Sequence, residues 1–317
     1  MSICAEAHQN KLKIALQARA LLYQKIRAFF AERQVLEVET PLLCQHTVTD
    51  PHIESFTVPT SNQSYFLQTS PEYAMKRLLS QGSGSIYQIC KAFRREEAGQ
   101  QHNPEFTMLE WYRLGFDHHA LMNEVDALLQ YCFNTPPAEK ISYQAVFQQY
   151  LSLDSFAVSL EALKKIMLEK IAITEHDLAS INKDTALQLL LSHCIEPHFG
   201  VEKPLFLYDF PPSQAALAKI NHGVAERFEL YLQGSEIANG FHELADAAEQ
   251  EARFKKNQVA RANNGYTVPK IDYYFINALK KGLPACAGVA IGLDRLLMFQ
   301  LSTKNIADVL PFPFHYA

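Results

Sequence analysis

Residues 87–113, YQICKAFRREEAGQQHNPEFTMLEWYR, predict two β-strands joined by a loop, with charges where a core strand would carry apolar side chains. Side chains two apart on a strand point to the same face, so Arg94 shares a face with Glu96. Four residues of the returning strand also share one face: Phe106, Met108, Glu110 and Tyr112. An arginine, carboxylates, an aromatic plane and a phenol suit an anionic, planar, partly cationic ligand. Taken alone, the stretch is also compatible with an exposed amphipathic hairpin whose charges are solvated.

Composition is that of an ordinary soluble protein, since 48% of the 317 residues are hydrophobic and 20% are charged. The net charge is −5 and no Lys/Arg run is dense enough for a nucleic-acid-binding arm, so overall charge does not favour a large RNA partner. The six cysteines form no C-x-x-C pair, so we expect neither a zinc site nor a disulfide framework. No signal-peptide pattern and no membrane-spanning run is present, which predicts a soluble, cytoplasmic protein with no membrane partner.

Hydrophobic periodicity predicts helices arranged around a sheet. We expect helices over residues 11–33, 71–81, 120–133, 159–169, 185–194 and 248–262, and strands over 229–232 and 239–244. A buried strand running into a helix is expected at GVAIGLDRLLMFQL, residues 288–301. Residues 134–200 carry no chemical cluster and predict a helical insertion. The whole pattern favours one α+β domain over residues 1–317, built around an antiparallel sheet flanked by helices.

A second cluster of charges occupies residues 226–244, ERFELYLQGSEIANGFHEL. Core strands rarely carry three glutamates without a counter-charge, because buried carboxylates need partners or metal ions. Asn239, Phe241 and Glu243 share one parity while Glu236 is out of step, which predicts a bulge or bend near residues 238–240. A solvated edge strand is the alternative for this segment taken alone.

Four segments in this order resemble the class II aminoacyl-tRNA synthetases, and their wording is most similar to the lysine enzymes. The helix expected over residues 11–33 and the extended segment after it, which ends at VETPLL (residues 38–43), together resemble motif 1, and residues 87–113 resemble motif 2. Residues 226–244 resemble the lysine-enzyme segment with NGF and three glutamates, and GVAIGLDR, residues 288–295, resembles motif 3. The resemblance covers nearly the whole chain, as a catalytic domain, and motif 1 implies a homodimer.

The resemblance implies activation of an amino acid by attack of its carboxylate on the α-phosphorus of ATP. Negative charge builds on phosphate oxygens in this reaction, so arginines and Mg²⁺ are needed there. As the resemblance implies, the catalytic residues are Arg94 on the α-phosphate and Arg295 on the γ-phosphate. The further ATP contacts that it implies are Glu96 at the adenine amino group, Phe106 stacked on adenine, His102 near the phosphates, Asn103 and Glu229. Glu229 and Glu236 match the family's magnesium ligands.

The resemblance also implies an amino-acid pocket. Glu72, Tyr112 and Glu243 match residues that hold the side-chain ammonium group of lysine. Glu110, Asn239 and Phe241 match residues near the backbone amino group. Carboxylates that converge in one pocket repel each other unless a cation fills it. A diamino acid supplies that cation, whereas a neutral or acidic substrate does not.

Two departures from the lysine enzymes bear on the acceptor and the substrate. Those enzymes carry an N-terminal OB-fold, whereas the motif 1 helix is expected here near residue 11, so we expect no N-terminal OB-fold and consider tRNA an unlikely acceptor. In motif 3 they typically read AGLGIGIDR where this chain reads AGVAIGLDR, so Ala290 replaces a glycine that lines the pocket. One methyl group shifts selectivity by roughly 1–3 kcal/mol, which favours a relative of lysine with a different backbone. Neutral drift explains Ala290 equally well from the sequence alone.

In both departures the chain resembles the elongation factor P–lysine ligases, the freestanding paralogues of lysyl-tRNA synthetase. This resemblance implies that (R)-β-lysine is activated with ATP and Mg²⁺ and transferred to the ε-amine of a lysine on elongation factor P. One alternative is a truncated lysyl-tRNA synthetase that charges tRNA. Another is a non-catalytic regulator. That alternative predicts that some of the ATP-contacting residues are replaced, and in this sequence none of them is replaced.

Overall fold

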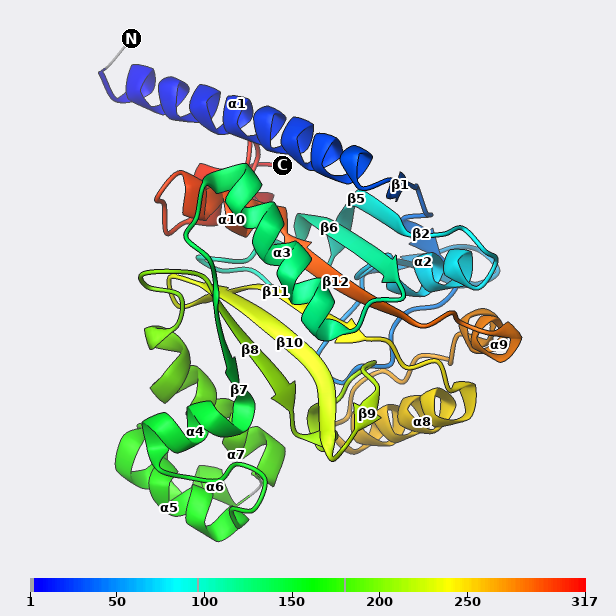
Figure 1. Cartoon of the computed structure of the whole chain (residues 1–317), viewed down its shortest axis with the longest axis vertical. Coiled ribbons are helices and arrows are strands. Elements are labelled where there is room, and N and C mark those ends of the chain that lie inside the picture. Colours follow the sequence, from blue (N-terminus) through cyan, green and yellow to red (C-terminus); the bar gives the residue numbers. More distant parts are fainter. Residues whose placement is uncertain (1–2, 96, 180) are drawn as a thin grey trace. The chain divides into compact units, whose positions relative to one another are not determined.

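The computed structural model describes residues 3–95, 97–179 and 181–317, with side chains from residue 10 onward. Two compact units make up the chain, and their elements are labelled in Figure 1. The first unit comprises Met1–Phe116 and Leu244–Ala317, and the second comprises Asp117–Glu243. Among the helices in the described ranges, none combines the length and apolar character needed to cross a membrane.

Four strands in the order β1-β5-β6-β12 form the sheet of the first unit. Their bounds are Leu36–Glu37 for β1, Ile86–Phe93 for β5, Glu105–Leu114 for β6 and Cys286–Gly292 for β12. Strands β5, β6 and β12 are antiparallel, whereas β1 runs parallel to β5. A small second sheet contains β2 (Leu43–Cys44), β4 (Ser64–Leu67) and β3 (Thr57–Pro59) in that order.

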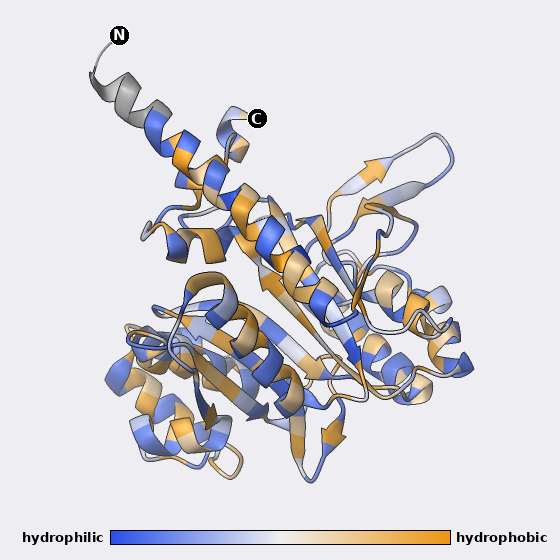
Figure 2. Ribbon diagram, turned by 45° about the horizontal axis from the view of Figure 1, so that its top comes forward, coloured by the Kyte–Doolittle hydropathy of each residue, from blue (hydrophilic) through white to orange (hydrophobic). Residues whose placement is uncertain are grey.

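The helices of the first unit are α1 (Ile3–Glu32), α2 (Glu72–Leu79), α8 (Ala247–Asn263), α9 (Tyr273–Lys281) and α10 (Leu293–Gln300), with short 3₁₀ turns at Ile306–Asp308 and Phe314–Tyr316. Figure 2 shows apolar residues alternating with polar ones along α1. Its buried side packs on the hairpin, where Phe30 stacks on Tyr87 with ring centroids 4.4 Å apart. Helix α2 packs on α9 through Tyr73 and Phe275, whose rings are stacked at 4.6 Å.

The second unit contains strands in the order β11-β10-β8-β7, with β9 paired to β10. Their bounds are Glu139–Ser142 for β7, Leu205–Phe210 for β8, Ile220–Asn221 for β9, Val224–Leu232 for β10 and Ser235–His242 for β11. Leu230 pairs with Ala238 but Tyr231 pairs with Glu236, which leaves Ile237 as an extra residue. This bulge confirms the predicted irregularity, one residue before the expected range.

Helix α3 (His118–Phe133) precedes β7, and most of the remaining helical segments lie between β7 and β8. These are α4 (Tyr143–Leu151), α5 (Leu160–Lys170), α6 (Glu175–Leu178), α7 (Lys183–Leu190), a π turn at Leu191–Ile195 and a 3₁₀ turn at Glu196–His198, with another 3₁₀ turn at Pro212–Gln214 after β8. A side-chain oxygen caps the first turn of each α-helix from α3 to α7: Asp117, Ser142, Ser159, Thr174 and Asn182. Helices α4 to α7 share an apolar core with β8.

The predicted α+β class is confirmed, but the sheet is mixed rather than antiparallel. Strand β1 pairs in parallel with β5, and β7 pairs in parallel with β8. Strands β1 and β7 are only two and four residues long, so their sequences contain too short a pattern to indicate the pairing direction. Every predicted helix is present, although α1 begins at Ile3 and the helix expected over 185–194 passes into a π turn after Leu190.

Candidate functional site

Arg94 lies directly after β5, where its backbone N–H donates to the carbonyl oxygen of Pro104 at 2.9 Å. Its Cζ atom is 5.2 Å from the centroid of the Phe106 ring, and Nη1 is 3.6 Å from the carboxylate of Glu97. The buried Nε atom has no hydrogen-bond partner among the residues that the structure describes. A buried donor without a partner is costly, so an acceptor that reaches Nε would be favoured. Glu96 lies outside the described residues.

Arg295, in the first turn of α10, contacts His102, with Nη2 2.6 Å from Nε2. Burial, together with the positive charge of Arg295, lowers the pKa of His102. A neutral imidazole can accept a hydrogen bond from the guanidinium, so this contact fixes both side chains. The structure therefore brings together two residues that were predicted to lie near the phosphates.

Asn103, another predicted ATP contact, uses its amide on the backbone. Its Nδ2 donates to the carbonyl oxygen of Glu105 at 2.6 Å, and its Oδ1 accepts from the N–H of Phe314 at 3.0 Å. These bonds hold the loop before β6, and the ATP contact stays a prediction.

Glu110 is the centre of the predicted amino-acid pocket in the first unit. Ser70 Oγ donates to its Oε2 at 2.8 Å, and the hydroxyl of Tyr112 donates to its Oε1 at 2.6 Å. Burial, with the negative charge of Glu72, raises the pKa of Glu110 to about 7 even though both hydrogen bonds and Lys76 oppose the rise. A buried carboxyl group in this state is suited to meet a cation, which would favour its ionised form.

Glu72 already has one cationic partner, which sequence reasoning missed. Lys76 lies one helical turn later on α2, and its Nζ is 2.7 Å from Glu72 Oε1. The lysine is 1% exposed and the glutamate side chain 17%, so this ion pair is largely shielded from water. The spacing of four residues in PEYAMKRLL was the available signal. Glu72 and Ser70 also line a cavity of about 370 Å³.

Ala290 lies directly opposite Glu110 in the pairing of β12 with β6. Directly opposed residues of an antiparallel pair point to the same face, so the Ala290 methyl group lies on the face of the Glu110 carboxyl group. On the same face Gly288 is opposite Tyr112 and Gly292 is opposite Met108. Ala290 thus contributes the single Cβ atom among these three alternate positions of β12.

Glu229, one of the two predicted magnesium ligands, is buried on β10. Arg227 Nη2 donates to its Oε1, and the hydroxyl of Tyr231 donates to its Oε2 at 2.6 Å. Glu229 pairs with Asn239 on β11, whose buried Oδ1 has no hydrogen-bond partner within the described ranges. This face of the two strands therefore presents both a carboxylate and an amide oxygen.

Glu196 is a second carboxylate at the Tyr231 hydroxyl, besides Glu229, and sequence reasoning missed it. The Tyr231 hydroxyl lies 3.0 Å from its Oε1, yet this hydroxyl has only one proton to donate. Burial and then the negative charge of Glu229 raise the pKa of Glu196, whereas the hydrogen bond from Tyr231 lowers it. The surrounding sequence, CIEPH, contains no pattern that indicates a functional site.

The other predicted residues of the second unit lie on or directly after β11. Glu236 is opposite Tyr231, and Phe241 is opposite Arg227, whose Cζ is 6.0 Å from the Phe241 ring centroid. Glu243 is buried and forms a backbone bridge with Ala218. From the sequence we expected a positively charged partner for Glu229 without identifying it, and in the structure this partner is Arg227.

The raised pKa of Glu110 predicts a dependence of stability on pH. Its ordinary value is 4.5 and its folded value is about 7, so the native state binds this proton more tightly than the unfolded state. The stabilisation is complete below about pH 4.5 and is lost as pH rises through about 7, a loss of order 3 kcal/mol. Glu110→Gln should remove this decline in urea unfolding measured from pH 5 to pH 8. Parallel declines in both proteins would assign the effect to another group.

Comparison with known proteins identifies the family of this chain. The family model of class II tRNA synthetases (D, K and N) matches residues 3–315. Elongation factor P–(R)-β-lysine ligase of Vibrio cholerae serotype O1 is 52% identical over 312 residues, which are 94% of this chain and 95% of that protein. The proteins of the same name from Salmonella gallinarum and Salmonella arizonae are 51% and 50% identical over 310 residues, 94% of each chain. The chain therefore belongs to the class II tRNA synthetase family (D, K and N), and within it to the family of the elongation factor P–(R)-β-lysine ligases.

Proposed function

We propose that this chain is an ATP-dependent ligase that activates (R)-β-lysine as an aminoacyl-adenylate and transfers it to the ε-amine of a lysine on elongation factor P. The observation that carries the proposal is the identity of 50–52% with ligases of that name over 94% of the chain. A ligase of a translation factor would act in the cytoplasm.

In the first step a carboxylate oxygen of the amino acid forms a bond to the α-phosphorus, and the bond to pyrophosphate breaks. Charge grows on the α-phosphate oxygens, where Arg94 donates hydrogen bonds. The buried Nε of Arg94 supports this role, because a phosphate oxygen would supply its missing acceptor. Arg295 binds the γ-phosphate and is oriented by His102. Phe106 stacks on adenine, with Glu96 and Asn103 as further contacts.

In the second step the lysine amine of the acceptor attacks the adenylate carbonyl. An amide bond forms, the C–O bond to AMP breaks, and AMP leaves with the electron pair while the amine loses a proton. We assign no general base among the described side chains to this step, because a neutral amine reacts with a mixed anhydride that is already activated.

Glu229 and Glu236 are proposed as magnesium ligands. Burial raises the pKa of Tyr231, and the next causes are the negative charges of Glu229, Glu236 and Glu196, so carboxylates converge on this hydroxyl. Carboxylate oxygens are ligands that Mg²⁺ prefers, and the residues present therefore fit this ion. When bound, Mg²⁺ would neutralise charge on phosphate oxygens.

The proposed substrate contacts are Glu72, Glu110, Tyr112, Asn239, Phe241, Glu243 and Ala290. The carboxylates explain why the substrate carries two amino groups, since each ammonium group stabilises an ionised carboxylate. Glu110 is the clearest case, because its pKa of about 7 leaves it ready to ionise when a cation arrives.

Replacement of Ala290 by glycine should shift substrate preference from (R)-β-lysine towards α-lysine. The substitution removes the Cβ atom opposite Glu110, and one methyl group in a pocket changes selectivity by roughly 10- to 200-fold. The measurement is the ratio of kcat/KM for the two amino acids in ATP–pyrophosphate exchange. Ala287→Gly is the control, because Ala287 is an alanine of the same strand that points to the other face. An unchanged ratio in Ala290→Gly would make Ala290 a product of drift.

An acceptor competition tests the function itself. Purified protein, ATP, Mg²⁺ and either (R)-β-lysine or α-lysine are offered unmodified elongation factor P and total tRNA together. We expect elongation factor P to gain the mass of one lysyl unit, faster with (R)-β-lysine. Label on tRNA with unmodified elongation factor P would instead indicate a truncated lysyl-tRNA synthetase. Absence of pyrophosphate exchange with any diamino acid would indicate a non-catalytic regulator.

A homodimer is proposed from the resemblance of residues 38–43 to motif 1. Exposed apolar side chains on α1 and the segment after it support the proposal: Ile14, Leu16, Leu21, Leu36, Leu42 and Leu43. Light scattering should give twice the 35.9 kDa of one chain. A monomeric mass at micromolar concentration would contradict the dimer.

A further inference from the structure

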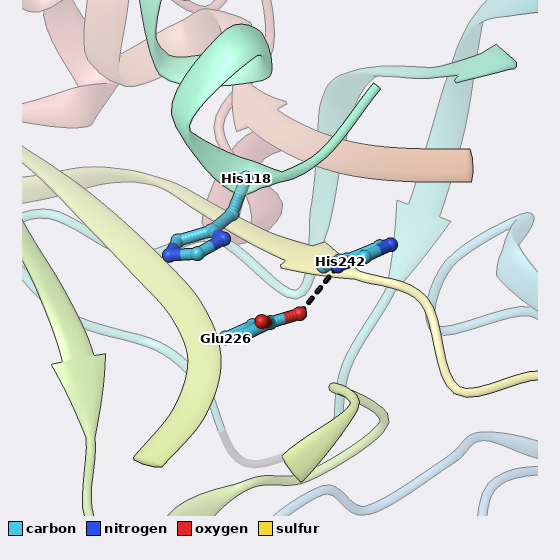
Figure 3. A group of neighbouring side chains, drawn as sticks. All are labelled: His118, Glu226 and His242. Carbon is cyan, nitrogen blue, oxygen red and sulfur yellow. Dashed lines mark hydrogen bonds and ion pairs between the residues drawn. The ribbon is translucent and has the colours of Figure 1, made fainter. Parts of the chain in front are cut away.

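Two histidines and a glutamate converge in the second unit, outside the residues assigned above. Figure 3 shows His118, Glu226 and His242 gathered at one place, with His242 Nδ1 bonded to Glu226 Oε2. One ligand atom from each of the three residues lies within 4.8 Å of the other two. His118 begins α3, Glu226 lies on β10 and His242 ends β11, so three elements meet here.

His118 has one nitrogen bonded and one nitrogen without a partner. Its side chain is 5% exposed, and its Nε2 is 3.0 Å from Asp209 Oδ1. The buried Nδ1 has no hydrogen-bond partner in the part of the chain that the structure describes. With Nε2–H donating to Asp209, Nδ1 presents a lone pair. Metal-binding histidines show this arrangement, because their second nitrogen usually donates to a carboxylate or carbonyl oxygen.

A buried nitrogen that lacks a hydrogen-bond partner has a cost in folding free energy. A bound cation would remove this cost.

We propose that His118, Glu226 and His242 bind one divalent transition-metal ion of the Zn²⁺ class, and that Asp209 orients His118 from outside the ligand set. Two imidazoles and one carboxylate are a ligand set that suits zinc and leaves a further position for water. The same set is poorly suited to Mg²⁺, which takes oxygen ligands. The cysteine pattern led us to expect no zinc site, but the ligands proposed here are two histidines and a glutamate that lie far apart in the sequence.

The ion would act on the end of β11. His242 lies between Phe241 and Glu243, which are proposed substrate residues, and successive side chains on a strand point to opposite faces. The metal would therefore tie β11 to β10 and α3 on the face away from those side chains. We expect metal to stabilise this unit without entering the substrate-binding face.

A second group, His118, His119 and Asp209, also has ligand atoms within 4.8 Å of one another. In that group the ligand atom of His118 would be Nε2, which would have to give up its hydrogen bond to Asp209. The Nδ1 atom of His118 would still have no partner. The orphaned Nδ1 therefore favours the group with Glu226 and His242.

The test is metal binding by the full-length protein after treatment with a chelator. Titration with Zn²⁺ by calorimetry, and with Co²⁺ by its visible absorbance, should show one equivalent bound with nitrogen ligation. His242→Asn and Glu226→Gln should weaken binding at least tenfold, and Asp209→Asn should weaken it 10- to 100-fold. His119→Asn should bind as the wild type does, as should the matched control His176→Asn, an exposed histidine of the same unit.

Urea unfolding in chelator gives the folding control, because a variant that binds poorly must unfold at a midpoint close to that of the metal-free wild type. Zn²⁺ should raise the midpoint of the wild type and of His119→Asn but not that of His242→Asn. Weak binding at several equivalents, binding that survives His242→Asn and Glu226→Gln, or binding lost in His119→Asn would each overturn the proposal. The readouts do not depend on ligase activity, so they stand apart from the proposed function.

Discussion

Arg94→Ala is expected to lower kcat for ATP–pyrophosphate exchange with (R)-β-lysine by roughly 10³-fold, because one preorganised donor to a developing oxyanion is worth about that much. The guanidinium lies over Phe106 and its buried Nε has no acceptor among the described residues. An interaction made chiefly in the transition state changes kcat more than KM. The fold should survive, because the Arg94 side chain is 27% exposed and supports no apolar core.

Two variants separate this role from a general effect of charge. Arg94→Lys keeps the charge but loses the planar fork, so it should recover only part of the rate. Arg95→Ala removes the adjacent, exposed arginine and should stay within about threefold of the wild type, as surface changes usually do. A loss below tenfold in Arg94→Ala, or an equal loss in Arg95→Ala, would take Arg94 out of the catalytic step.

The hairpin was predictable because its evidence is local. Strand parity alone placed Glu110 and Tyr112 on one face, and the structure joins them by a hydrogen bond. The same parity put Phe106 on that face, where Arg94 now lies over its ring. The bulge in β11 was predictable for a similar reason, since Glu236 and Glu243 could not share a face on an unbroken strand.

What the sequence did not reveal depends on distant residues or on competition between charges. Lys76 pairs with Glu72, so one carboxylate of the pocket is already compensated. Glu196 reaches the Tyr231 hydroxyl from a segment predicted only as a helical insertion. His118, Glu226 and His242 are separated by more than a hundred residues at their widest, and no local spacing brings them together. The helix before residue 11 was missed because ICAEAHQN has no apolar stripe of its own.

Replacement of Asp294 has the largest expected effect on stability, although the sequence analysis assigned a role only to its neighbour Arg295. Asp294→Ala should lower the free energy of unfolding by about 3–5 kcal/mol, because it leaves a buried charge without its partner. The carboxylate is 2% exposed, and it accepts from Arg19 Nη2 at 2.5 Å and from the backbone N–H of Thr107 at 2.6 Å. The substitution thus leaves both a guanidinium and a buried amide unsatisfied. Urea unfolding measures the loss.

A double mutant distinguishes loss of this ion pair from loss of packing. Arg19→Met with Asp294→Leu removes both charges and should be more stable than Asp294→Ala, because no uncompensated charge remains. Asp294→Asn should fall between the wild type and Asp294→Ala, since its amide oxygen can still accept from Thr107. A loss below about 1 kcal/mol in Asp294→Ala would show that water reaches Arg19. Because Asp294 ties the first turn of α10 to α1 and to β6, the same bonds set the position of Arg295, the next residue along that turn.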